Sequence, residues 1–92
     1  MRMIWSIFMD NRELEKLLNG WVGLDFTFRN GKCGKIIKIH YFGLSGPRVF
    51  YTLVGIRNKK GKDALFALQG WSFLQRLNSY PEPIPVPVSM NN

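Results

Sequence analysis

The fold is decided by the stretch WVGLDFTFRNGKCGKIIKI, which occupies residues 21–39. Apolar residues at every second position of 22–28 predict a strand with one buried face, because successive strand side chains point to opposite sides. The Asn30-Gly31 pair tolerates positive φ and predicts a tight turn, while Gly34 indicates a bulge or a slightly longer loop. A second strand follows, so the stretch predicts a β-hairpin.

This second strand spans residues 35–42, and strict alternation gives it two faces. One face carries Ile37, Ile39 and Tyr41, and the other carries Ile36, Lys38, His40 and Phe42. Runs of β-branched and aromatic residues predict a third strand at 48–57 and a fourth at 64–68, joined by a turn at 58–62. A last helical turn follows, with Phe73, Leu74 and Leu77 as its apolar positions.

A short helix is predicted ahead of the hairpin. Asp10 and Glu13 have the spacing of a capping box, in which each side chain accepts from the backbone amide of the other residue. Gly20 is positioned to end the helix in a left-handed conformation. Three leucines at helical spacing predict the face that docks on the sheet, and these are Leu14, Leu17 and Leu18.

Together these segments predict a mainly β fold with a short N-terminal helix, built as a small antiparallel barrel of four to five strands. Closure into a barrel covers strand edges that a small open sheet leaves exposed. The expected organisation is an N-terminal lead and helix at 1–20, the barrel at 21–79 and a proline-rich tail at 80–92. Alternating prolines predict a stiff extended tail, either free or laid over the barrel through Ile84, Val86 and Val88.

The hairpin resembles a known family. Gly34, Ile36 and Ile39 match the G-x-V/I-x-x-I part of the KOW-type hairpin of SH3-like barrels, after an alternating strand and a glycine-containing loop. The resemblance implies an SH3-like barrel. It also implies a partner among those of the family, which are RNA, DNA, ribosomes and RNA polymerase.

The charge of the chain is concentrated in one segment. Thirteen Lys and Arg against six Asp and Glu give a net charge of +7. Residues 26–62 contain nine of these basic residues and no acid, so the remainder of the chain is net negative. Such a segment attracts polyanions, and its alternative role is to provide a solvated surface that keeps the protein soluble.

The sequence therefore predicts a nucleic-acid-binding surface, with DNA and RNA both open as partners. Its candidate residues are Arg29, Lys32, Lys35, Lys38, His40, Arg48, Arg57, Lys59, Lys60 and Lys62. Aromatic residues in the same strands could stack on bases or pack in the core, and alternation prevents all of them from facing inward.

Enzymatic function is not expected. One His and one Cys cannot form a His/Cys metal cluster or an internal disulfide, and no phosphate-binding glycine loop is present. We therefore expect no catalytic residue, metal or cofactor, and we interpret Cys33 as an incidental turn residue. The single cysteine fits a reducing cytoplasm. The longest uncharged run of the chain body, residues 64–75, is shorter than the about 20 residues that cross a bilayer.

A second function from a different class is open. The apolar segments 1–9 and 84–88 provide more apolar surface than so small a domain needs. Apolar surface that the domain does not cover itself indicates a protein-interaction or accessory factor that docks on an acidic surface of a larger machine, or a homodimer that buries it.

Overall fold

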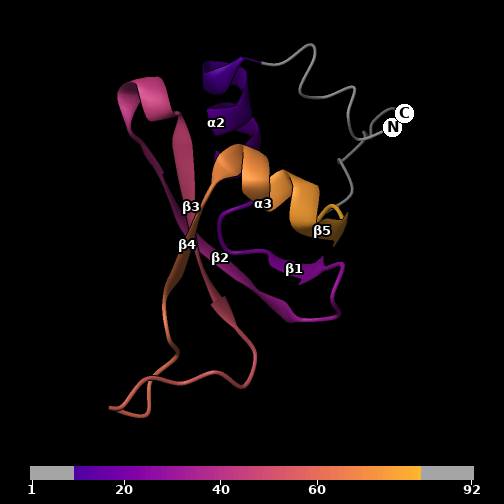
Figure 1. Cartoon of the computed structure of the whole chain (residues 1–92), viewed down its shortest axis with the longest axis vertical. Coiled ribbons are helices and arrows are strands. Elements are labelled where there is room, and N and C mark those ends of the chain that lie inside the picture. The colour runs from indigo at the N-terminus through magenta and orange to yellow at the C-terminus, as the bar shows by residue number, and fades with distance from the viewer. Residues whose placement is uncertain (1–9, 82–92) are drawn as a thin grey trace, which may run out of the picture.

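The computed structural model describes residues 10–81, which form an antiparallel sheet of five strands with two α-helices. The strand order is β4-β3-β2-β1-β5, and each pair is antiparallel (Figure 1). The elements in chain order are α2 (Asn11–Asn19), β1 (Asp25–Phe28), β2 (Cys33–Tyr41), the 3-10 turn η1 (Gly43–Ser45), β3 (Pro47–Leu53), β4 (Phe66–Gln69), α3 (Gly70–Arg76) and β5 (Leu77–Ser79). The expectations for segments 1–9 and 82–92 lie outside the described residues.

The start of α2 is confirmed. The Glu13 amide donates to the Asp10 carboxylate at 2.9 Å, and the Asp10 amide donates to the Glu13 carboxylate at 3.2 Å. The predicted left-handed ending at Gly20 is wrong, because Gly20 keeps a right-handed φ of −67°. The chain winds on for a further turn, and Gly23 adopts the positive φ of +89°.

The leucine face of α2 docks as predicted. Leu14 and Leu18 are fully buried, and Leu17 is partly buried against the same core. A side-chain hydrogen bond also joins the two helices, since the indole nitrogen of Trp71 in α3 donates to Asn11 at 3.0 Å. The helix therefore belongs to the same packed unit as the sheet.

The predicted hairpin is confirmed as β1 and β2. Gly31 has a φ of +92°, and the Asn30 side chain accepts from the Lys32 amide at 2.9 Å, which fixes the turn locally. Gly34, however, does not form a bulge. It pairs with Phe26 on one side and Leu53 on the other, and a Cβ at this position would collide with the Thr52 carbonyl.

The bulge lies three residues further along β2. Ile36 pairs with Tyr51 and Lys38 pairs with Phe50, so Ile37 is an extra residue without a partner in the register with β3. The predicted faces of β2 are therefore wrong on the N-terminal side of the bulge, where Ile36 was placed with Lys38 and His40, and are confirmed beyond it. Ile36 and Ile39 both point to the core, and Lys38 and His40 point to the opposite side.

The later strands are shorter than predicted. β3 ends at Leu53, and residues 54–65 form a long arm that extends beyond the sheet (Figure 1). The turn at 58–62 is confirmed, since the Asn58 side chain accepts from the amides of Lys60 and Lys62. β4 and α3 match the predicted fourth strand and helical turn, but Leu77 begins β5, which the sequence pattern did not reveal.

The mainly β class with a short helix is confirmed, whereas closure into a barrel is not observed. β4 and β5 occupy the two outer positions of the sheet, and within residues 10–81 they do not pair with each other. One face of the sheet is covered by both helices. The core on that face is aromatic, with Phe26, Phe28, Tyr51 and Phe73 in mutual ring contact at centroid distances of 4.8–5.6 Å.

Candidate nucleic-acid interface

The face of β2 and β3 opposite the two described helices carries alternating cationic and aromatic side chains. β3 alternates regularly, with Val49 and Tyr51 buried on the helix side, so Arg48 and Phe50 point to the other side. The residues opposite them in β2 share this orientation: His40 pairs with Arg48, and Lys38 pairs with Phe50. The bulge at Ile37 thus places these side chains on one surface.

Direct contacts join the cations to the rings. The Lys38 ammonium lies 5.0 Å from the centre of the Phe50 ring, and the Arg48 guanidinium lies 5.4 Å from that of Phe42. The His40 ring contacts the same Phe42 ring at a centroid distance of 4.3 Å. We call this surface the basic–aromatic face, and it consists of Lys35, Lys38, His40, Phe42, Arg48 and Phe50.

One acid reaches the end of this face. The Lys35 ammonium lies 3.6 Å from the Asp25 carboxylate and 3.4 Å from the Gly23 carbonyl oxygen, and both side chains of the ion pair are exposed. An exposed ion pair of this kind contributes little and is easily exchanged for another anion. It is the only ion pair among residues 10–81, so the positive charge of the face is otherwise uncompensated there.

The arm between β3 and β4 collects another four of the predicted cations. The Arg57 guanidinium donates to the Gly61 carbonyl at 2.9 Å, and the backbones of Arg57 and Asp63 form an isolated antiparallel β-bridge across the arm. The other three, Lys59, Lys60 and Lys62, are exposed in the turn. The arm is therefore a second cationic region, separate from the basic–aromatic face.

The last two predicted cations, Arg29 and Lys32, lie in the β1–β2 turn at a pocket on the helix side of the sheet. This cavity of about 590 Å³ lies between the turn, β3, β4 and the end of α3. Rings of Phe28, Tyr51 and Phe66 and the cationic Arg29, Lys32 and Arg76 line it. None of the residues that line it is acidic. We call it the cationic pocket.

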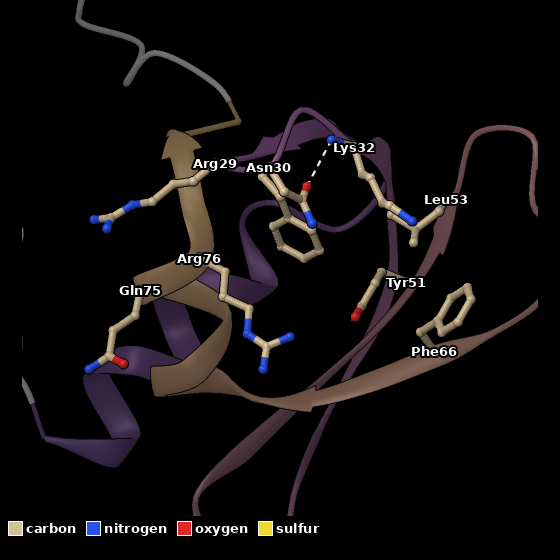
Figure 2. Close-up of a pocket in the computed structure, with 9 residues that line it drawn as sticks. Arg29, Asn30, Lys32, Tyr51, Leu53, Phe66, Gln75 and Arg76 are labelled. Atoms are coloured by element: carbon tan, nitrogen blue, oxygen red, sulfur yellow. Dashed lines mark hydrogen bonds between the residues drawn. The ribbon is translucent and has the colours of Figure 1, made fainter.

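Figure 2 shows how the pocket is arranged. Arg76 extends from α3 toward the Tyr51 hydroxyl, whereas the Arg29 side chain points away. The Arg29 amide donates to the Arg76 carbonyl at 2.8 Å, which ties the turn to the end of α3. Burial raises the pKa of the Tyr51 hydroxyl above its ordinary value of 10.0, and the Arg76 guanidinium partly opposes this shift.

The ten predicted residues thus fall into three groups. Two further residues that belong to these sites, Phe50 and Arg76, were not among the ten. Lys35, Lys38, His40 and Arg48 share one face, while the remainder lie on the arm and at the pocket. Phe50 is one of the strand aromatics that could stack on bases or pack in the core, and only the register with β2 places it beside Lys38. Arg76 lies outside the acid-free segment, so no charge pattern pointed to it.

Residues 10–81 lack two other features. This part of the chain contains no group of three His, Cys, Asp or Glu side chains that could hold a metal ion. No helix in it is long and apolar enough to cross a membrane. Cys33 is exposed at the start of β2, where its sulfur lies 3.7 Å from the Gly31 carbonyl oxygen.

Comparison with known proteins adds no relative. The chain matches no protein-family model, no curated protein and no solved structure.

Proposed function

We propose that this protein is a non-enzymatic module that binds single-stranded nucleic acid through its basic–aromatic face. One observation carries the proposal: cations and aromatic rings from β2 and β3 alternate on a sheet face that neither described helix covers. The cations can contact the phosphates of the backbone, and bases can stack on the aromatic rings.

The rings favour single strands over duplexes. Bases in a duplex are already stacked on each other, whereas bases of a single strand can stack on protein side chains. Phe42 is 45% exposed although it is a large apolar residue, and its contacts with His40 and Arg48 hold it at the surface. A single-stranded nucleic acid that lies along β2 from His40 to Lys35 would span about 16 Å, since a β-strand rises about 3.3 Å per residue.

The arm extends the electrostatic reach of this face. Lys59, Lys60 and Lys62 are exposed in the arm, which follows the end of β3 at which Thr52 pairs with Lys35 (Figure 1). Their role in the proposal is to attract the phosphate backbone and raise the encounter rate, without contacts to bases.

We also propose that the sheet is of the SH3-like class. The order β4-β3-β2-β1-β5 supports this, as do a helical turn between β4 and β5 and a bulge where β2 changes its partners. The residues of the KOW-type resemblance fit as well: Gly34 lies between two strands, and Ile36 and Ile39 face the core. This analogy supports the fold class and leaves the choice of nucleic acid to experiment.

The test is a titration of labelled RNA and DNA oligonucleotides, single- and double-stranded, with the full chain at several salt concentrations. Contact with about four phosphates of a single strand gives a slope of log K against log salt of about −3. Lys38→Ala should weaken binding and make this slope shallower by about 0.7. Lys16→Ala is the matched control, since Lys16 is exposed on α2 at the covered side of the sheet. Absence of binding at low salt would end the proposal.

A second candidate is a protein-docking module, and exposed apolar side chains favour it. Leu44 in η1 is fully exposed, and Val54 and Leu65 at the base of the arm are 79% and 56% exposed. A partner retained by the full chain after nuclease treatment, together with no affinity for any oligonucleotide, would favour this candidate over nucleic-acid binding.

A further inference from the structure

The cationic pocket contains the hydroxyl of Tyr51, a polar group that packing of the core does not require. Tyr51 is only 5% exposed, and its ring contacts Phe26, Phe28, Phe66 and Phe73. Its hydroxyl is directed into the pocket, where it is open to solvent rather than sealed in the core, and it makes no hydrogen bond with a side chain of residues 10–81 (Figure 2). A phenylalanine would fill the same core position, so the hydroxyl is available to a bound molecule.

Positive charge surrounds this hydroxyl. The Arg76 guanidinium extends toward it and forms neither an ion pair nor a side-chain hydrogen bond with the described residues. Lys32 flanks the pocket on the side of Leu53 (Figure 2). Because no carboxylate lines the cavity, these cations and the hydroxyl together form a donor set for an anion.

Aromatic rings form another part of the pocket wall. Phe66 is half-buried and stacks on Tyr51 with a centroid distance of 5.7 Å and an interplanar angle of 22°. Phe28 presents its ring at 86° to Tyr51. A flat ring can extend this stack, and the cavity volume lies within the range of about 300–1,000 Å³ that is usual for small-molecule sites.

These features select one ligand chemistry. A cation is repelled by Arg76 and Lys32, inorganic phosphate leaves the aromatic wall unused, and a neutral ring leaves the donors unused. We infer that the cationic pocket binds a nucleoside monophosphate, with the phosphate at Arg76 and the Tyr51 hydroxyl and the base toward Phe66. The pocket lies on the opposite side of the sheet from the basic–aromatic face, so this site is independent of the proposed function.

The nucleotide has two possible sources with the same chemistry. It can be a free nucleoside monophosphate, or it can be the phosphorylated terminal nucleotide of a strand. Competition distinguishes them. If an oligonucleotide with a 5′-phosphate displaces the mononucleotide and the same oligonucleotide without the phosphate does not, the ligand is the phosphorylated end of a strand. Displacement by neither assigns the free nucleotide.

The experiment is an NMR titration of the full chain with UMP and AMP, each compared with its nucleoside and with inorganic phosphate. We expect saturable shifts at Phe66, Tyr51 and Arg76 with the monophosphates, and much weaker binding of nucleoside or phosphate alone. Arg76→Ala and Tyr51→Phe should each weaken binding about tenfold, as expected for hydrogen bonds to a charged group. Arg57→Ala in the arm is the matched control and should leave the affinity unchanged.

Two results would overturn the inference: no saturable shifts at the pocket, or phosphate binding as tightly as the monophosphates. Lys38→Ala separates this site from the proposed function. It should weaken oligonucleotide binding at the basic–aromatic face and leave mononucleotide binding intact. Either site can therefore fail in the experiment without the other.

Discussion

His40 and Arg48 face each other across β2 and β3, and both contact one phenylalanine ring. The ring is that of Phe42, which lies 4.3 Å from the His40 ring centroid and 5.4 Å from the Arg48 guanidinium carbon. Two residues from different strands thus hold an exposed aromatic side chain in place. Its orientation is fixed before any ligand arrives, which lowers the entropic cost of stacking on it.

Loss of this ring should weaken binding of single strands. We expect Phe42→Ala to reduce affinity for a single-stranded oligonucleotide by about 1–3 kcal/mol, since that is the usual contribution of one stacked base. Fluorescence anisotropy measures the change. Leu44→Ala is the control, because Leu44 is a fully exposed apolar residue of the adjacent turn. Equal losses for the two variants would mean that Phe42 contributes only apolar surface.

Stability at alkaline pH should depend on Tyr51. A pKa that is higher in the folded than in the unfolded chain means that the native state holds the proton more tightly. This contribution to the free energy of unfolding is complete below the ordinary value of 10.0 and is lost as the pH rises through the folded-state pKa. Urea unfolding of the wild-type chain and Tyr51→Phe across this range measures it. The difference between the two should change with pH above 10.0 and stay constant below it.

Gly34 should be intolerant of any side chain. A Cβ there meets the Thr52 carbonyl, so β2 and β3 would have to separate, and we expect Gly34→Ala to cost about 3 kcal/mol or more. Gly61→Ala is the comparison, since Gly61 has a φ of +80° but open space around it. Backbone strain alone should then cost about 1–2 kcal/mol. Chemical denaturation gives both values, and a milder effect at Gly34 than at Gly61 would contradict the close approach.

The docking of α2 should depend on its two buried leucines. Leu14→Ala removes a fully buried side chain and should lower the free energy of unfolding by about 2–5 kcal/mol. Leu17→Ala removes a partly buried one and should cost about 1 kcal/mol. A single cooperative transition is expected in both variants because the helix shares the core of the sheet. A separate early transition for α2 would show that it folds independently.

Local signals in the sequence were reliable where both partners lie within one turn. Asp10 and Glu13 predicted the helix start, and Asn30 and Asn58 marked turns in which their side chains bond to nearby amides. None of these contacts depends on the remainder of the fold. This locality explains why they could be predicted from residue type and spacing alone.

Features that depend on distant partners could not be predicted. In β2, Ile36 and Ile37 are adjacent and equally apolar, so only the pairing with β3 decides which one points inward. β5 is three residues long, and its strand conformation comes from pairing with β1. Likewise, Arg76 reaches Tyr51 because α3 returns to the β1–β2 turn, which no spacing in the sequence expresses.

The unpaired Ile37 determines which positions of β2 are equivalent in a sequence alignment. If the same residues paired without the bulge, regular alternation from Ile36 would turn Lys38 and His40 into the interior and Ile39 toward water. Deletion of Ile37 should therefore be tolerated better than deletion of a neighbouring residue, because Ile36 would still pair with Tyr51 and Lys38 with Phe50. An alignment with any distant homologue should place its gap here, or it will pair inward positions with outward ones.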